Sequence, residues 1–424
     1  MIGVTKYFKS SLIQNTFFLF VNKGVNAFVP IILIPLCNNF FGVEQYGNLI
    51  FAQATLGLLI VFADYSFSVS APRDISANAH DLKKVSTIFS SIYSIKIILG
   101  IVGFLVILLF PYISSNKSQF HLQLFTCVYL ALLLQSFLPF WFFQGVKKNH
   151  LITSINLLSK AVFISLVFLV ATKQKEIFWI PLIEFLAYVL ALILSLFILF
   201  KNFDINFQFA SLTNMYKQLK GGWSIFIIIL LYWMINGGSI MLVKLFSTDE
   251  ELGYFSVFSR VGYYLFAIFQ PIIFSVVPFM TEKFVKSTKV EAYQYFNKIF
   301  KYFVAGAIFI TLVLFLIADT IFKHFFNLAF YEKLANYNSA FYILLIWIFF
   351  LLVNNFMAMQ LLIASSKDKV FRLFLSLNAA LVTILFFILV PILKSQGAAI
   401  SMLCGELLFF LLIMGYYIKD QKTN

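Results

Sequence analysis

Long apolar runs separated by short polar gaps recur along the whole chain. Each run is long enough to cross a hydrocarbon core of about 30 Å as a helix, and none has the strict alternation of a porin strand. We count about twelve runs, at residues 12–36, 46–70, 86–110, 120–144, 150–171 and 178–200, then, after a more polar linker at 204–220, at 221–246, 253–280, 302–323, 337–364, 370–391 and 396–418. The pattern predicts an all-α polytopic membrane protein.

Composition supports this class and excludes a soluble enzyme or binding domain. Hydrophobic residues make up 62% of the 424 residues, charged residues make up 11%, and the mean hydropathy is +0.94. A soluble globular domain has about 25% charged residues. The first run is too long and too uniformly apolar for a signal-peptide core, so we expect it to remain in the mature chain.

Lysine and arginine then orient the helices, because these residues concentrate in loops that stay in the cytoplasm. With the N-terminus inside, the inner loops hold basic clusters such as Lys83–Lys84, Lys147–Lys148 and the run from Lys283 to Lys301, whereas the outer loops hold few. Both termini are therefore expected in the cytoplasm. The net charge of +14 reflects this topology and attraction to anionic lipid headgroups, so a nucleic-acid partner is not expected.

The chain also contains an internal repeat. The segment EQYGNLIFA from Glu44 resembles EELGYFSVF from Glu250, which pairs Gly47 with Gly253, and Glu184 in the sixth run corresponds to Glu406 in the twelfth. Six spans separate the copies, so both have the same orientation in the membrane. We expect two six-helix lobes, residues 1–204 and 205–424, with a cavity between them.

One carboxylate, Asp64, lies within the second apolar run. A charge at membrane depth costs about 2.5 to 3.5 kcal/mol on insertion scales, so such a residue rarely faces lipid. On a helix, Gln53, Gly57, Asp64 and Ser68 share one face, which should line protein or water. Asp64 is expected either to titrate during transport or to balance a cation in the cavity.

Basic residues within the spans suggest an anion site. Lys23 lies near the middle of the first span beside Asn22 and Asn26, and Arg260 lies in the eighth span on one face with Tyr263. A buried cation in each lobe suits a phosphate group, since charge-assisted hydrogen bonds are strong in a partly desolvated site. We expect Lys23 and Arg260 to bind substrate charge and the polar side chains to line the cavity.

Other charged residues within the spans have alternative interpretations. Lys160 lies deep enough to join the cation site, and Glu184 and Glu406 would serve ion coupling, charge balance or interhelical hydrogen bonding. Structural ion pairs among these residues are the competing explanation. Lys96 and Lys244 lie toward span ends, where reaching to the headgroups is the favoured interpretation.

No cofactor is expected. The three cysteines and four histidines lack the spacing of a metal site, and the Gly-Gly pairs are not followed by the Lys-Ser or Lys-Thr of a phosphate-binding loop.

Two segments carry a resemblance to a known family. DYSFSVSAPRDIS, from Asp64 through Arg73 to Ser76, resembles the end of the second helix in bacterial polysaccharide flippases of the Wzx type. PFWFFQGVKK, from Pro139 through Gln144 to Lys148, is similar to the end of their fourth helix. The turn at Tyr46-Gly47 is also similar, and the likeness extends over the whole chain in length and span number.

This resemblance implies a member of the multidrug, oligosaccharidyl-lipid and polysaccharide exporter superfamily, with a V-shaped fold that alternates between inward-open and outward-open forms. The implied activity is transport, not catalysis: an undecaprenyl-pyrophosphate-linked O-antigen repeat unit moves from the cytoplasmic to the periplasmic leaflet of the inner membrane. Related flippases use cations of the first and eighth helices at the pyrophosphate, and here these helices contain Lys23 and Arg260. Arg73 and Gln144 would belong to a gate, and polymerase and chain-length proteins would be partners.

Two alternatives stay open at this point. A multidrug or other lipid-linked glycan exporter of the same superfamily would have the same span number. A membrane O-antigen polymerase or glycosyltransferase would be an enzyme of similar size, but it would carry a long outer loop, and every outer gap here is short.

Overall fold

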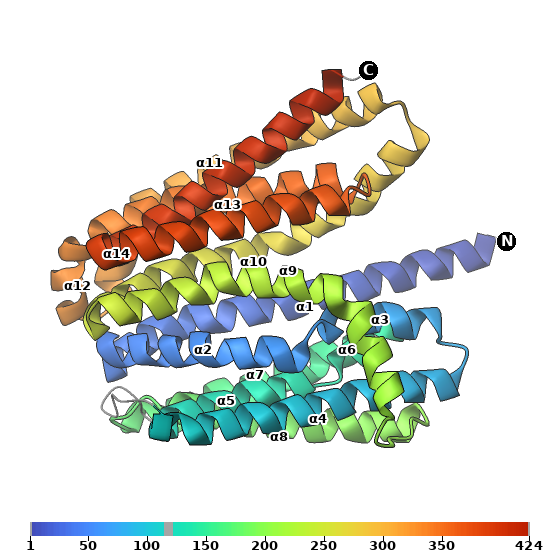
Figure 1. Ribbon diagram of the computed structural model, residues 1–424, viewed down its shortest axis with the longest axis horizontal. Coiled ribbons are helices and arrows are strands. Elements are labelled where there is room, and N and C mark those ends of the chain that lie inside the picture. Colours follow the sequence, from blue (N-terminus) through green and yellow to red (C-terminus); the bar gives the residue numbers. More distant parts are fainter. Residues whose placement is uncertain (1, 114–121, 423–424) are drawn as a thin grey trace. The chain divides into compact units, whose positions relative to one another are not determined.

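The computed structural model describes residues 2–113 and 122–422, and all regular structure within these ranges is helical (Figure 1). The α-helices are α1 (Ile2–Phe41), α2 (Val43–Asp64), α3 (Phe67–Ala77), α4 (Leu82–Ile113), α5 (Leu122–Phe137), α6 (Phe140–Gly145), α7 (Asn149–Leu169), α8 (Trp179–Asn202), α9 (Leu212–Phe246), α10 (Asp249–Lys286), α11 (Lys289–Phe325), α12 (Leu328–Leu334), α13 (Asn338–Met357) and α14 (Asp368–Lys422). Within the described ranges, 11 helical stretches are long and apolar enough to cross a membrane. The predicted all-α polytopic fold is confirmed.

The helix α14 accounts for the twelfth predicted span because it folds back on itself. Lys394 adopts a left-handed φ of 51° inside this 55-residue element. A Cβ on Gly397 would lie 2.3 Å from the Leu389 carbonyl oxygen, and one on Gly405 would lie 2.1 Å from a methyl carbon of Val382. The two halves are therefore antiparallel neighbours, each long enough to span the membrane.

Two predicted spans are interrupted. The span expected at 46–70 breaks between α2 and α3, where Tyr65 has a φ of 55° and stacks on Phe226 with ring centroids 4.4 Å apart. The span expected at 120–144 breaks before α6 at Pro139, which cannot donate a helical backbone hydrogen bond. The long helix predicted through Asp64 is thus wrong: Asp64 ends α2, and Ser68 belongs to α3.

Contacts divide the chain into two compact units. The first comprises residues 1–29 and 51–233, and the second comprises residues 30–50 and 234–424. Because α1, α2 and α9 each contribute residues to both units, the units differ in extent from lobes at 1–204 and 205–424. The assignment of six helices to each lobe stays a prediction.

The first unit is held together by aromatic packing at the ends of α3, α4 and α6. Trp141, Phe142 and Phe143 of α6 are buried against Phe89 of α4 and residues of α3. At the start of α4, the Asp81 carboxylate accepts a hydrogen bond from the Lys84 backbone N–H, which lowers the pKa of Asp81. The aromatic packing of α3, α4 and α6 positions the segment that joins α8 to α9.

In the second unit α13 lies beside α10, α11 and α14. Three consecutive acidic residues at the start of α10 bind three different elements. Asp249 pairs with Lys244 of α9, and Glu250 pairs with Lys333 of α12 at 2.8 Å. Glu251 accepts hydrogen bonds from the backbone N–H and hydroxyl of Ser395, at 3.0 and 2.6 Å, and so stabilises the turn of α14.

Candidate functional site

A file of buried polar side chains runs along α7 in the first unit. Asn149, Thr153, Asn156 and Lys160 recur at intervals of three or four residues, which places them on one face of the helix, and all four are buried. The rest of α7 is largely apolar. A single polar face on an apolar membrane helix should contact protein or a water-filled path.

This face contacts α1. The Asn156 side-chain amide donates to the Oδ1 atoms of Asn22 and Asn26, at 2.7 and 3.0 Å. The Thr153 hydroxyl donates to the Phe18 carbonyl oxygen at 2.7 Å. Asn22 and Asn26, which were predicted to line a polar cavity, thus belong to an amide cluster that retains N–H donors for a ligand.

Farther along α7, Lys160 is bound by α8. Its ammonium donates to the Glu184 carboxylate and to the Tyr188 hydroxyl, each at 3.1 Å, and Tyr188 donates to the same carboxylate at 3.1 Å. The structure therefore brings together Lys160, which was predicted for the cation site, and Glu184, which was predicted for ion coupling or charge balance. The pair offsets part of the cost of placing either charge at membrane depth, and pyrophosphate binding by Lys160 stays a prediction.

Asp64 has a buried partner. The Lys96 ammonium donates to Asp64 Oδ1 at 2.6 Å and to the Ser136 carbonyl oxygen, and the Lys96 side chain is fully buried. The interpretation that Lys96 reaches to the headgroups is therefore wrong, because this ion pair joins the end of α2 to α4 and α5. Gln53 lies half-buried three turns before Asp64 on α2.

The two segments that carry the family resemblance pack on one another. A Cβ on Gly145 would lie 2.8 Å from Ile75 and 3.1 Å from the Pro72 carbonyl oxygen, so only glycine permits this approach of α6 to α3. Arg73 pairs with its neighbour Asp74 and is exposed, and Gln144 is also exposed. A gate role for Arg73 and Gln144 stays a prediction.

In the second unit, Arg260 lies near the aromatic side chains of Tyr46 and Tyr263, and Glu406 lies near Tyr263. The Tyr263 ring packs edge-on against Trp347 with centroids 5.0 Å apart. These contacts place Arg260 in a protein-lined environment.

Glu406 lies on the second half of α14. Its carboxylate and its backbone carbonyl both accept hydrogen bonds from the Asn354 amide, at 2.6 and 2.7 Å. Glu406 thus makes interhelical hydrogen bonds, which is one of the alternatives predicted for it.

The structure also contradicts the prediction that Lys244, near the end of a span, reaches toward the headgroups. Its side chain is buried, pairs with Asp249, and donates to Asn48 Oδ1 at 2.8 Å. Reaching toward the headgroups is therefore the wrong interpretation for Lys244. It instead links α9 to α2 and to the start of α10.

The two cations predicted to bind substrate charge belong to different compact units. Lys23 belongs to the first unit, where it is exposed beside the amide cluster, and Arg260 belongs to the second. Sequence reasoning missed Asn156 and Thr153, although their spacing from Lys160 was a readable signal. Across residues 2–113 and 122–422, no three His, Cys, Asp or Glu side chains come together as a metal site.

Comparison with known proteins identifies sequence relatives. Residues 12–284 match the model of the family described as "Polysaccharide biosynthesis protein". A protein of Escherichia coli (strain K12) named "Putative O-antigen transporter" is 25% identical over 417 residues, covering 98% of both chains. A protein of the same name from Shigella dysenteriae is 22% identical over 307 residues, covering 70% of this chain and 72% of its own.

Solved structures show the same fold at low sequence identity. The lipid II flippase MurJ, in an inward closed conformation, matches with a TM-score of 0.72 and 14% identity, covering 96% of this chain and 87% of its own. A MATE transporter of Vibrio cholerae matches with a TM-score of 0.63 and 13% identity, covering 99% and 98%. The expected MATE-like fold is confirmed.

Proposed function

Because the chain belongs to the polysaccharide biosynthesis protein family, we propose that it is a flippase for lipid-linked oligosaccharides. Its substrate is an undecaprenyl-pyrophosphate-linked repeat unit of O-antigen or a similar surface polysaccharide. The protein moves the repeat unit from the cytoplasmic to the periplasmic leaflet of a bacterial inner membrane by alternating access. It is a transporter and catalyses no covalent step.

The observation that carries this proposal is the polar file on α7 with its asparagine cluster. A hydrated oligosaccharide cannot enter hydrocarbon unless polar groups replace its water, because each unsatisfied polar group there costs several kcal/mol. Asn22, Asn26 and Asn156 supply amides that both donate and accept hydrogen bonds, as sugar hydroxyls do. The lipid tail needs no such path, since it stays in the bilayer.

We assign the pyrophosphate to Lys23 and Arg260. Glu184 and Tyr188 surround the Lys160 ammonium. Arg260 adds a planar guanidinium that can bind two phosphate oxygens at once. Lys160 then serves charge balance within the first unit.

Two driving forces suit this transport. An inside-negative potential assists an anionic headgroup that moves outward by about 2.3 kcal/mol per charge per 100 mV. Antiport of protons or sodium is the alternative, with Asp64 or Glu406 as the titrating group. Imposing a potential without a pH or sodium gradient, and then each gradient without a potential, distinguishes the two.

The test is a reconstitution experiment. Proteoliposomes that contain the purified protein and a lipid-linked oligosaccharide are treated with an impermeant lectin, which reports the sugar on the outer surface. We expect the protein to increase the lectin-accessible fraction relative to protein-free liposomes, and Asn156→Leu to abolish that increase. Equal accessibility with and without protein would reject the proposal, and ethidium efflux instead would favour a multidrug exporter.

Loss of surface glycan in a deletion strain, with rescue by the intact gene, provides the cellular counterpart. Polymerase and chain-length proteins are the proposed partners, because they act on the repeat unit after it reaches the outer leaflet. A polymerase would itself change chain length in vitro, whereas a flippase changes only location.

A further inference from the structure

The segment between α8 and α9 alternates apolar and polar side chains. Phe203 is followed by Asp204, Ile205, Asn206, Phe207, Gln208 and Phe209. Alternation with a period of two is the pattern of an extended chain with one apolar and one polar face. In the structure residues 204–211 are indeed neither helix nor turn.

Three serines at four-residue intervals on α4 bind the backbone of this segment. The Ser86 hydroxyl accepts from Asn206 N at 3.4 Å, Ser90 accepts from Gln208 N at 3.1 Å, and Ser94 accepts from Ala210 N at 3.0 Å. Four helical residues rise about 6.0 Å and two extended residues about 6.6 Å, so the two repeats match. The segment is therefore held along α4 by its backbone.

Phe203, Ile205 and Phe207 pack against the first unit, whereas Phe209 is exposed. Ile205 is 3% exposed, and the Phe203 ring lies 5.3 Å from that of Phe142, while Phe207 contacts Tyr93. The polar side chains at 204, 206 and 208 are consequently presented on the opposite side.

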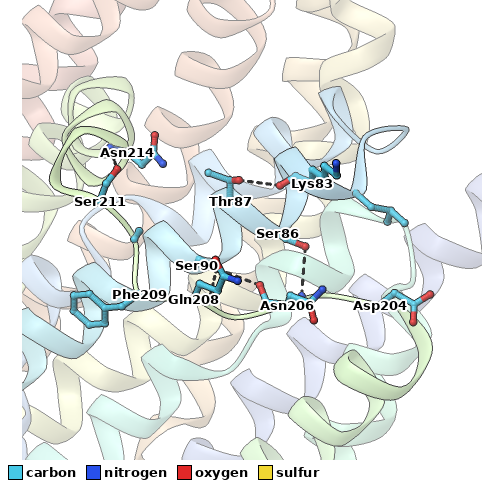
Figure 2. A pocket seen from close by; sticks show the side chains of 12 residues that line it. Lys83, Ser86, Thr87, Ser90, Asp204, Asn206, Gln208, Phe209, Ser211 and Asn214 are labelled. Atoms are coloured by element: carbon cyan, nitrogen blue, oxygen red, sulfur yellow. Dashed lines mark hydrogen bonds between the residues drawn. The ribbon is translucent and has the colours of Figure 1, made fainter.

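These polar side chains line a groove with α4 and the start of α9 (Figure 2). Its volume is about 570 Å³, within the range of about 300 to 1,000 Å³ typical of small-molecule sites. The serines and Thr87 already bind backbone groups. Within the described parts of the chain, the side-chain amides of Asn206, Gln208 and Asn214 have no such partner.

The chemistry of the groove suits a neutral polyhydroxyl ligand. An amide donates and accepts, so it can pair with a sugar hydroxyl in either orientation. Among the described residues that line the groove, only Lys83 and Asp204 are charged, and their opposite signs disfavour a nucleotide or phosphate. Phe209, 61% exposed, offers a ring face to the C–H side of a sugar.

We propose that this groove binds the sugar residues of the glycan at the cytoplasmic end of the first unit, before translocation. The inference rests on the proposed function, because it assigns the groove to the same substrate. The groove lies outside the polar file on α7. Its amides distinguish glycans by the positions of their hydroxyl groups, so the groove determines which glycans the protein accepts.

Binding is tested with the full-length protein in nanodiscs and the repeat-unit oligosaccharide released from the surface polysaccharide of the source strain, without lipid or pyrophosphate. Saturation-transfer NMR should detect the bound sugar. The double variant Asn206→Ala/Gln208→Ala should weaken binding about tenfold, as expected for two lost hydrogen bonds. It should fold normally, because the serines bind backbone atoms. Asn202→Ala, an exposed amide outside the groove, is the matched control and should bind as wild type.

Two outcomes overturn the inference: no signal from the oligosaccharide, or equal signals from wild type and the double variant. If either occurs while wild-type proteoliposomes still move lipid-linked glycan, the proposed function stands alone. If the oligosaccharide binds through Asn206 and Gln208 but no lipid-linked glycan moves, the groove stands as a glycan site and the flippase proposal fails.

Discussion

Gly47 of α2 and Gly253 of α10, the two glycines that the internal repeat makes equivalent, lie in direct contact. A Cβ on Gly47 would lie 2.9 Å from the Gly253 backbone nitrogen. A Cβ on Gly253 would lie 2.2 Å from the Val43 carbonyl oxygen. Both glycines therefore lie where the backbones of α2 and α10 meet, and neither position has room for a side chain.

Gly253→Ala should destabilise the protein, because the added methyl group must displace backbone atoms. We expect a loss of about 1 to 3 kcal/mol in the free energy of unfolding. Thermal unfolding of the detergent-purified protein measures the change. Gly306→Ala and Gly415→Ala are matched controls, since nothing lies within 4 Å of a Cβ at either helical position. Equal melting temperatures for all three variants would contradict the steric explanation.

Asp64→Asn should destabilise the protein by removing the partner of a fully buried ammonium. Breaking a buried ion pair on one side costs about 3 to 5 kcal/mol, whereas replacing both partners costs less. The double variant Asp64→Asn/Lys96→Met should therefore be more stable than Asp64→Asn alone. Thermal unfolding provides the double-mutant cycle.

The exposed pair Lys84–Asp81 supplies the control for that cycle. Lys84→Met should change stability by less than about 1 kcal/mol. If Lys96→Met does not rescue Asp64→Asn, the two side chains are not energetically coupled. Unchanged transport and pH dependence in Asp64→Asn would exclude a titrating role for this carboxyl.

Lys23→Ala and Arg260→Ala should each abolish or strongly reduce surface glycan at normal protein levels, because each removes a proposed phosphate contact. Lys23→Arg should retain more export than Lys23→Gln, and Arg260→Lys should fall between wild type and alanine. Glycan immunoblots and membrane immunoblots measure the two quantities. Lys298→Ala, an exposed lysine, is the control. Wild-type export by both alanine variants would remove these cations from the site and direct attention to Lys160.

Single cysteines at Glu44 and Lys394 should react with an impermeant thiol reagent in intact cells, whereas those at Lys84 and Lys148 should not. All four positions are exposed, so accessibility reports the side of the membrane rather than burial. The three native cysteines are first replaced by serine. The expectation follows from the basic inner loops. Reversed labelling would invert both the orientation and the proposed direction of transport.

The helical type and the approximate number of membrane spans followed from the sequence, because a helix in hydrocarbon satisfies its backbone locally and needs about 20 apolar residues. The same locality made the polar face of α7 readable, since Thr153, Asn156 and Lys160 repeat with the helical period. The repeat that pairs Gly47 with Gly253 was also visible without coordinates. The interruption after Asp64 was not, because no proline or glycine marks the break between Asp64 and Phe67.

Only the tertiary structure decided which side chains form ion pairs and hydrogen bonds with one another. Lys96 meets Asp64 and Asn156 meets Asn22 across large separations in sequence, and the choice depends on which helix faces pack together. The same holds for the turn at Lys394, where Glu251 of another helix binds Ser395, and for the groove, where α4 holds the extended segment. Local periodicity determines which face of a helix is polar, but the energy of burying a charge or an amide depends on what the fold places opposite it.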